Sequence, residues 1–371
     1  MCDSDAAGCS NQSERPNNSG NKKRSSVSLA DGGRSNKNAN KEQAELHPVV
    51  QELVSSGEVR VDDKKIDLKF NLTSDERITH FSMRGRATAV FPVESVALSS
   101  LEPQLPHYIH HKPTAKLYWP EEGRKSEVDI LQKVYEIAKK NEEGKVKHHV
   151  PEALGIDDAV TGRRVFYIIV FRELRPITKL SRDEFLSAWW QIIVCHYALW
   201  ENGVHHRDIN PSNLMIYKTL GGRWIGVLND FDLSSTQDTP LGQERTGTVP
   251  FMAQHLLSEE GIIGEVKHLY QHDAESFIWR TKLHDWLRVD ARGCREEKKD
   301  FLNDGRKTIT PSLSHGGSWK VARSCLLAIH AQYGPEKAPI LEDQVVFDTW
   351  IRKSMIKPNK LSPALLDVRL S

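Results

Sequence analysis

The sequence predicts an α+β fold in which a smaller, β-rich first part is followed by a larger, helical second part. Runs rich in branched and aromatic residues, typical of strands, are concentrated between residues 59 and 171. Apolar residues at helical spacing dominate after residue 181. A hairpin pattern over residues 214–229 has Asp and Asn side chains at its two ends. We expect the functional site of the protein at the two ends of this hairpin.

Composition divides the chain and limits its function. Residues 1–45 are rich in Ser, Asn and Lys and almost lack aliphatic side chains, which predicts a disordered tail. Order is expected from residue 46, with a first part over 46–173 and a second part over 174–371. Within the tail, Lys22-Lys23-Arg24 is either a nuclear targeting signal or an ordinary solvated basic triplet.

Charge and cysteine content exclude several classes of protein. Lys and Arg number 51 against 50 Asp and Glu, so binding of nucleic acid through bulk charge is not expected. The five cysteines show no metal or redox spacing, which indicates reduced thiols in an intracellular protein, cytoplasmic or nuclear. The most apolar helical run, residues 189–200, contains Gln191 and His196, so no membrane span is expected. The first residues form no apolar signal region, so secretion is not expected either.

The first strands surround a tight turn. Residues 59–70 alternate loosely between apolar and polar side chains, and strands are predicted on both sides of Arg84–Ala89. This turn is either an ordinary hairpin turn or a phosphate-binding loop. In the second case the Gly85 backbone would approach phosphate, and Arg86 and Thr88 would supply donors. A Pro-containing loop is expected over residues 92–113.

A lysine on a strand and a glutamate on the following helix are expected to form an ion pair. Lys116 lies in the predicted strand 114–119, and a helix is predicted from Ser126. Glu127 falls on the apolar face of this helix, where a carboxylate is costly unless it is paired. Lys116 is the nearest available cation. The alternative is a Glu127 side chain that turns to solvent at the helix end.

Later elements are predicted from the same patterns. Residues 164–171 form a strand that ends before Pro176, and a helix follows a capping box of Ser181 and Glu184 and ends at Gly203. His196 on this helix is expected to be a core histidine. Residues 290–308 are highly charged, which predicts a solvated insert, and amphipathic helices are predicted over 318–333 and 340–356. Their core candidates are Trp319, Leu326, Leu327, Ile329, Trp350 and Ile351.

The hairpin predicts the site. Asp208 and Asn213 precede its first strand, Gly221-Gly222 forms its turn, and Asp230 follows its second strand. Because a hairpin brings its outer ends together, these oxygen-bearing side chains should converge. Such oxygen ligands suit Mg²⁺, and one carboxylate remains to orient a hydroxyl group. A bound metal, a phosphate and an oriented hydroxyl group are what phosphoryl transfer requires.

The same residues carry a resemblance. His206-Arg207-Asp208, then Asn213, then Asp230-Phe231 resembles the catalytic loop and metal-binding loop of protein kinases. Further motifs make the chain similar to the fungal-type protein kinase family over about residues 83–287. These are Lys116 followed by Trp119, Arg124 and Glu127, then Asp230-Phe231-Asp232, Thr246–Ala253 and His272–Phe277. The resemblance implies a bilobal protein-kinase-like fold, with a small β-rich N-lobe, a larger helical C-lobe, and ATP and Mg²⁺ between them.

The resemblance also implies roles for individual residues. Asp208 would orient the acceptor hydroxyl and accept its proton, and Lys116, paired with Glu127, would hold the α- and β-phosphates of ATP. Asn213 and Asp230 would bind Mg²⁺.

Two regulatory and structural roles are left open. Arg207 would face a phosphate or carboxylate on the activation segment, with Thr236, Thr239 and Thr246 as candidate phosphorylation sites. An activation segment that is ordered without Arg207 is the alternative. Asp273 caps a helix, binds the backbone of the catalytic loop, or does both.

Departures from the kinase pattern keep three functions open. Asp232 replaces the glycine of the metal-binding loop, Asn210 replaces the usual lysine of the catalytic loop, and Gln254 interrupts Ala-Pro-Glu. Only Gly85 remains of the glycine-rich loop. A Ser/Thr protein kinase with a protein substrate is the first hypothesis. A small-molecule kinase is the second, because of Asn210, and a non-catalytic scaffold is the third.

Overall fold

The fold is given by a computed structural model, which describes residues 58–61, 64–70, 78–81, 87–95, 113–120, 124–161, 164–237, 246–279, 286, 288–310, 316–333 and 340–353. By their contacts, residues Met1–Leu46 and His47–Ser371 form two units, and all described residues lie in the second. The tail predicted over residues 1–45 lies outside the described residues.

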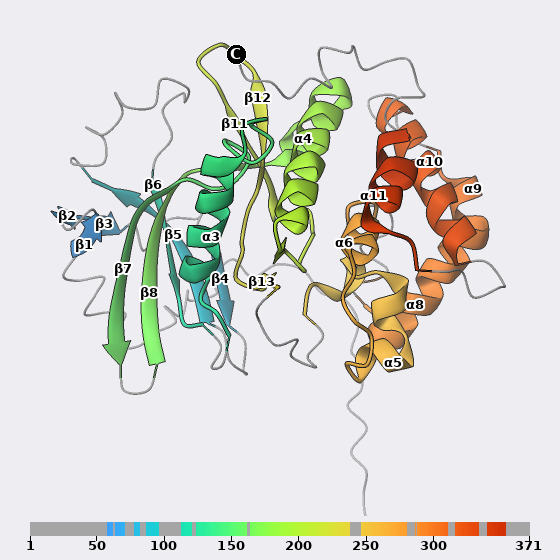
Figure 1. The fold of residues 1–371 in the computed structure, drawn as a ribbon, viewed down its shortest axis with the longest axis horizontal. Helices are drawn as coiled ribbons and strands as arrows, with labels where there is room; N and C mark the ends of the chain where they lie inside the picture. Colours follow the sequence, from blue (N-terminus) through green and yellow to red (C-terminus); the bar gives the residue numbers. More distant parts are fainter. Residues whose placement is uncertain are drawn as a thin grey trace, which may run out of the picture. The chain divides into compact units, whose positions relative to one another are not determined.

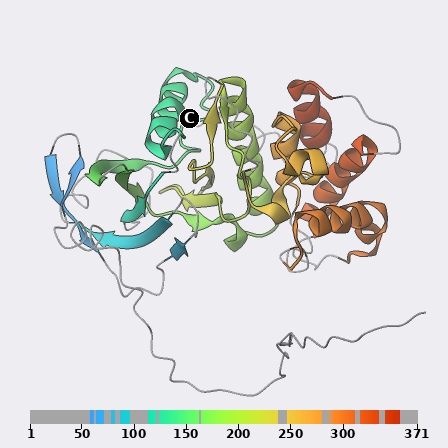
Figure 2. The same ribbon diagram turned by 90° about the horizontal axis from the view of Figure 1, so that it is seen from below.

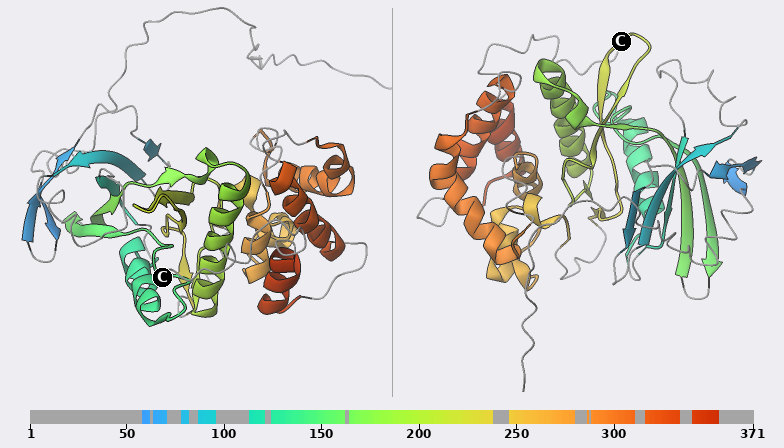
Figure 3. Two further views of the ribbon diagram at one scale, coloured as in Figure 1. Left: turned by 90° about the horizontal axis from the view of Figure 1, so that it is seen from above. Right: turned by 180° about the vertical axis from the view of Figure 1, so that it is seen from behind.

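An antiparallel sheet forms the β-rich part. Its six strands are β3 (Lys69–Phe70), β4 (Ile78–Phe81), β5 (Ala87–Glu94), β6 (Pro113–Tyr118), β7 (Ala153–Thr161) and β8 (Arg164–Arg172). The strand order is β3-β5-β6-β8-β7, and β4 also pairs with β5. A separate hairpin joins β1 (Glu58–Val61) and β2 (Lys64–Asp67). The long antiparallel pair of β7 and β8 is visible from both sides in Figures 1 and 3.

The predicted strands are present, with two corrections. The loop expected from residue 92 was placed too early, because β5 continues to Glu94 with Pro92 opposite Thr114 of β6. Pro92 is tolerated because none of the described strands pairs with it on the other side of β5: β4 pairs with residues before Pro92 and β3 with residues after it. The strand β7 was not predicted, since adjacent aspartates, Asp157 and Asp158, interrupt its apolar pattern. Its position at the edge of the sheet lets such side chains reach solvent.

Helix α3 (Glu127–Lys140) begins where the sequence predicted. Ser126 is its N-cap: the Ser126 hydroxyl accepts a hydrogen bond from the Asp129 N–H, and the Asp129 carboxylate accepts one from the Ser126 N–H. Ile130 and Leu131 are fully buried on its apolar face, and Glu127 lies on the same buried side. The helix therefore presents a carboxylate towards the interior.

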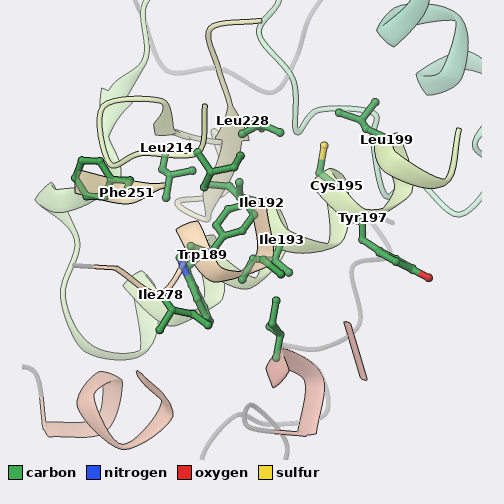
Figure 4. Close-up of a cluster of buried hydrophobic side chains, with 14 of the residues drawn as sticks. Trp189, Ile192, Ile193, Cys195, Tyr197, Leu199, Leu214, Leu228, Phe251 and Ile278 are labelled. Atoms are coloured by element: carbon green, nitrogen blue, oxygen red, sulfur yellow. The ribbon is translucent and has the colours of Figure 1, made fainter. Parts of the chain in front are cut away.

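Helix α4 (Arg182–Glu201) is the central helix of the second part. Residues 188–200 are all buried, so the helix is covered on every side. It packs against β12 of the hairpin β11 (Leu214–Lys218) and β12 (Trp224–Leu228), as Figure 1 shows. Figure 4 shows side chains of α4 meeting Leu214, Leu228 and Phe251 in this core. The predicted capping box at its start is wrong, because the Ser181 side chain makes no capping hydrogen bond.

A close backbone contact fixes β12 on α4. A Cβ atom at Gly226 would lie 2.2 Å from the carbonyl oxygen of Ala188, so only glycine permits this approach. The Gly226 N–H donates to Gln191 Oε1 (2.9 Å), and its carbonyl oxygen lies 2.8 Å from Nδ1 of His149. These contacts hold the strand that leads directly to Asp230.

His149 should make the protein sensitive to acid. Its Nδ1 donates to a carbonyl oxygen and its Nε2 is buried without a partner, so burial lowers the pKa of His149 to about 4. The unfolded chain gains this proton near pH 6.5 and the folded chain only near pH 4, so stability is complete above that window and is lost as the pH falls through it. We expect a loss of about 2 kcal/mol between pH 7.5 and pH 5 from this residue. Urea unfolding at both pH values checks this: His149→Gln should reduce the pH-dependent difference, and an unchanged difference would contradict the assignment.

The remaining elements are short strands and the helices and helical turns of the second part. They are β9 (Arg175–Pro176), η2 (Ile177–Lys179), β10 (Val204–His205), β13 (Ser235–Thr236), η3 (Val249–Phe251), η4 (Gln254–Leu257), α5 (Glu259–Ile262), α6 (Tyr270–Ser276), α8 (Ala291–Asp300), η5 (Phe301–Gly305), α9 (Arg306–Thr308), α10 (Gly316–Gln332), α11 (Asp343–Val346) and η6 (Phe347–Arg352). Of the short strands, β9 pairs with β11 and β10 with β13. The helices from α5 onward, yellow-orange to red in Figure 2, follow the hairpin in the chain, and α10 packs on α4. None of the helices in the described ranges has the length and apolarity needed to cross a bilayer.

Two predictions for these elements are corrected. Residues 290–308 are not a solvated insert, because α8 and η5 bury Cys294, Lys298, Phe301 and Leu302. Leu327, a core candidate, is 46% exposed, whereas Leu326, Ile329, Trp350 and Ile351 are buried as predicted and Trp319 is partly buried. The predicted α+β organisation is confirmed, and the boundary at residues 173/174 stays a prediction.

Candidate active site

The hairpin brings its two ends together as predicted. Leu214 of β11 lies opposite Leu228 of β12, and the Asn229 N–H donates to the carbonyl oxygen of Asn213 (2.9 Å). The Asn213 side-chain amide donates to the Asp208 carbonyl oxygen (2.9 Å) and to Asp208 Oδ2 (3.1 Å). Asn213 and Asp208 are therefore in contact, next to the residue that precedes Asp230.

Lys116 of β6 lies between two carboxylates. Its ammonium contacts Glu127 Oε2 at 2.5 Å and Asp230 Oδ1 at 2.6 Å, so the predicted ion pair is present and has a second partner. Glu127 is 1% exposed, whereas the Asp230 side chain is 38% exposed. Three distant segments, a strand, a helix and the end of the hairpin, thus meet at one buried cation.

The charges of this cluster are strongly coupled. Burial alone would lower the pKa of Lys116, but Asp230 and Glu127 raise it well above its ordinary value. Burial would raise the pKa of Asp230, but the Lys116 ammonium lowers it overall. For Glu127 burial outweighs Lys116, and its pKa is raised. Lys116 and Asp230 are therefore charged near neutral pH, with Asp230 as the more accessible carboxylate.

Glu127 also holds the loop around Asp230 directly. Its Oε1 accepts a hydrogen bond from the Phe231 N–H (3.0 Å), and the Phe231 ring is buried against the His206 ring at a centroid distance of 5.0 Å. His206 Nε2 lies 3.0 Å from the Asn229 carbonyl oxygen. Asp230 itself has φ +65°, a conformation that Asp tolerates better than most residues. The loop around Asp230 is fixed by helix α3 on one side and by the catalytic loop on the other.

Thr248 is a site residue whose role the sequence motifs do not reveal. Its N–H and its hydroxyl both donate to Asp208 Oδ1, each at 2.9 Å. Gly247 makes this approach possible, because it has φ +116° and a Cβ there would lie 2.8 Å from the Arg207 carbonyl oxygen. The Thr246-Gly247-Thr248 sequence was the available signal. The carboxylate of Asp208 is therefore oriented by Thr248 and Asn213 together.

The Asn210 side chain makes its hydrogen bonds within the loop that carries Asp208 and with Thr248. It is buried, and its Oδ1 accepts from the backbone and hydroxyl of Ser212. Its side-chain amide lies 3.4 Å from the Asp208 carbonyl oxygen and 3.3 Å from the Thr248 hydroxyl. The residue that stands in place of the usual lysine thus links the catalytic loop to Thr248.

Asp273 binds the backbone of the loop that carries Asp208. Its Oδ2 accepts from the Arg207 N–H (3.2 Å) and from His196 Nε2 (2.9 Å), and its Oδ1 accepts from His268 Nε2 (2.7 Å). The predicted bond to the catalytic-loop backbone is therefore confirmed. The N-cap alternative is wrong, because α6 begins at Tyr270 and its N-cap is Leu269. His196 is a core histidine as predicted, but it also braces this carboxylate.

Arg207 and the candidate phosphorylation sites are only partly described. Burial and the positive charge of Arg124 lower the pKa of Arg207. Thr236 is 7% exposed and accepts a hydrogen bond from Lys125 Nζ (2.8 Å), and Thr246 is 9% exposed. Thr239 lies outside the described residues. Modification of Thr236 or Thr246 would require the segment to move, and the role of Arg207 stays a prediction.

The predicted phosphate loop is mostly outside the described residues, which include neither Gly85 nor Arg86. Thr88 lies on β5, opposite His80 of β4 and Tyr118 of β6, and is partly buried. A phosphate-binding role for these three residues stays a prediction.

The donor set fits Mg²⁺. Asn213 offers an amide oxygen and Asp230 a partly exposed carboxylate, which are the hard ligands that Mg²⁺ takes together with phosphate oxygens and water. Among the described residues no group of three or more His, Cys, Asp or Glu side chains could hold a metal ion by itself.

Three comparisons relate this chain to known proteins. Residues 138–280 match the model of a family described as fungal protein kinase. CBL-interacting protein kinase 24 of Oryza sativa subsp. japonica is 25% identical over 223 residues, which is 57% of this chain and 46% of that protein. The match thus spans about half the length of that relative. Among solved structures, vaccinia related kinase 3 gives a TM-score of 0.47 with 13% identity, covering 84% of this chain and 96% of that one.

Proposed function

We propose, because residues 138–280 match the model of the fungal protein kinase family, that the chain is an ATP-dependent Ser/Thr protein kinase. It would transfer the γ-phosphate of Mg-ATP to a hydroxyl group of a protein substrate. The observation that carries this proposal is the contact of the buried Lys116 ammonium with both Glu127 and the more accessible Asp230, which joins three segments of the chain. A fully formed cluster of this kind has the positive charge for phosphates and the carboxylate for a metal side by side.

Each side chain has a role that follows from its contacts. Bound Mg-ATP would supply the phosphoryl group, and its Mg²⁺ would neutralise negative charge on the phosphates. Lys116, held by Glu127, would bind the α- and β-phosphates, and Asp230 with Asn213 would bind Mg²⁺. Asp208, oriented by Thr248 and Asn213, would orient the acceptor hydroxyl and accept its proton. The phosphate-loop roles of Gly85, Arg86 and Thr88 belong to the same proposal.

One observation favours a second candidate, a small-molecule kinase. Position 210 carries a neutral amide that is bonded to Ser212 and lies near Thr248, so the catalytic loop offers no lysine to the transferring phosphate there. A small acceptor held by its own contacts could do without that charge.

Phosphate transfer from labelled ATP distinguishes these candidates. Wild type and Asp208→Ala are incubated with Mg²⁺, γ-labelled ATP and either a panel of proteins or a pool of metabolites. We expect label on protein, reduced by about 10²- to 10⁴-fold in Asp208→Ala because a positioned base contributes that much. Label on metabolites alone would support the second candidate. If wild type transfers no more label than Asp208→Ala, the catalytic proposal is wrong, and thermal stabilisation by Mg-ATP would then indicate a nucleotide-binding scaffold.

A further inference from the structure

A buried ammonium lies outside the cluster described above. Lys298 of α8 is 0% exposed, and its Nζ lies 4.7 Å from the ring centroid of Trp279 and 5.4 Å from that of Trp286. It donates a hydrogen bond to the carbonyl oxygen of Met252. Aromatic faces favour a cation, but complete burial costs free energy, and burial lowers the pKa of Lys298 to about 8. The fold therefore retains this charge at the expense of stability.

A buried carboxylate binds the same stretch of backbone. Glu275 of α6 is 0% exposed, and its Oε1 accepts from the Gln254 N–H at 2.9 Å and from Trp279 Nε1 at 3.0 Å. Its Oε2 accepts from the Tyr333 hydroxyl at 2.6 Å. The cation thus binds a carbonyl oxygen at residue 252 and the anion an N–H at residue 254, so each charge takes the backbone group that matches it.

Hydrogen bonds continue from this point to the catalytic carboxylate. The Met252 N–H donates to the Thr248 carbonyl oxygen at 3.2 Å, closing the turn η3. The N–H and hydroxyl of Thr248 donate to Asp208 Oδ1. On the other side of the turn, helix α8 packs against η3 and η4, and Cys294 Sγ lies 3.8 Å from the Val249 carbonyl oxygen. Met252 is therefore linked to Asp208 through Thr248.

We propose that Lys298, together with Glu275, is a positioning residue that holds residues 248–254 in place and so sets where an acceptor chain meets Asp208. The pair replaces the anchor that the sequence lacks, since Gln254 interrupts Ala-Pro-Glu. This inference rests on the proposed kinase function for its catalytic consequence, although the anchoring of the segment can be tested without activity.

Substitutions can separate the charge from the hydrogen bonds. Glu275→Gln keeps an oxygen for Gln254 and Trp279 and offers an amide to the Tyr333 oxygen. Lys298→Met keeps the volume and removes the bond to Met252. The double variant combines Lys298→Met with Glu275→Gln. Because replacing both members of a buried charge set is often neutral or stabilising, it should keep the Tm of wild type or exceed it. Lys299→Met, a partly exposed lysine on the same helix that pairs with Glu296, is the matched control.

Steady-state kinetics give the first readout. For Lys298→Met and the double variant we expect kcat/KM for the acceptor to fall by about tenfold, with the KM for ATP and the Mg-ATP thermal shift unchanged. Lys299→Met should behave as wild type. Two results would overturn the proposal, because each would show that the charge is merely structural. One is an equal decrease of kcat/KM for the acceptor and for ATP. The other is a large decrease of Tm in both variants.

Amide hydrogen exchange gives the second readout. The amides of residues 248–257 should exchange faster in both Lys298 variants, with the rest of the protein unchanged. Unchanged exchange in this segment would overturn the proposal. If wild type itself transfers no phosphate, the proposed function fails, while the exchange measurement still decides whether Lys298 holds the segment.

Discussion

Asp230→Asn should abolish the effect of magnesium on nucleotide binding and lower phosphoryl transfer by at least about 10²-fold. Asp230 is the only charged ligand in the proposed metal set, and its carboxylate also contacts Lys116 at 2.6 Å. The asparagine keeps the size of the side chain but loses the negative charge that favours a divalent cation. Lys116 keeps its contact with Glu127, so the fold should persist.

Thermal unfolding with ATP, in the presence and absence of Mg²⁺, measures this effect. A ligand at 100 times its Kd stabilises the folded state by about 2.7 kcal/mol, which is readily detected as a rise in Tm. Wild type should show an additional rise with Mg²⁺, and Asp230→Asn should show none. Asp304→Asn, at a carboxylate with 86% of its side chain exposed, is the control and should match wild type. A magnesium-dependent rise that persists in Asp230→Asn would mean that the metal is bound elsewhere.

The second large effect is expected from Asp273→Ala, in the stability of the fold. The carboxylate is 1% exposed and accepts hydrogen bonds from Arg207, His196 and His268. Truncation leaves these donors buried without an acceptor, which should lower the free energy of unfolding by about 3 kcal/mol or more. Because the Arg207 N–H loses its partner, the loop that carries Asp208 should also lose activity at temperatures where the protein remains folded.

Urea unfolding at pH 7.5 checks the stability of this variant. Asp273→Asn, which keeps one acceptor oxygen, should lie between wild type and Asp273→Ala. Burial alone would raise the pKa of Asp273, but the two histidines hold it well below its usual value. Its contribution is therefore present above about pH 4 and is lost as the pH falls through the lowered pKa. A free energy of unfolding within about 1 kcal/mol of wild type would contradict the bracing role.

Local patterns predicted much of the fold because they report on neighbours in the chain. The start of α3 at Ser126 and the hairpin of β11 and β12 each follow from a few adjacent residues. The pairing of Lys116 with Glu127 followed from the cost of burying an unpaired carboxylate. Each of these predictions needed only residues that lie near one another in the chain.

The errors arose where a distant contact decided the outcome. Lys298 lies in a highly charged stretch that predicted exposure, yet the rings of Trp279 and Trp286 receive its ammonium. Asp157 and Asp158 interrupt the apolar pattern of β7, and the position of this strand at the edge of the sheet accommodates them. Thr248 gained its role only because Gly247 lets the chain pass over Arg207.

By itself, the sequence determined which chemical groups this protein carries and the elements on which they lie, including Asp208, Asn213 and Asp230 at the ends of one hairpin. Only the tertiary structure decided which further partners they have: Asp230 as the second carboxylate at Lys116, and Thr248 as a donor to Asp208. The physical reason is that propensity and periodicity act over a few residues of chain, whereas electrostatic and hydrogen-bond partners are chosen by distance in the folded state.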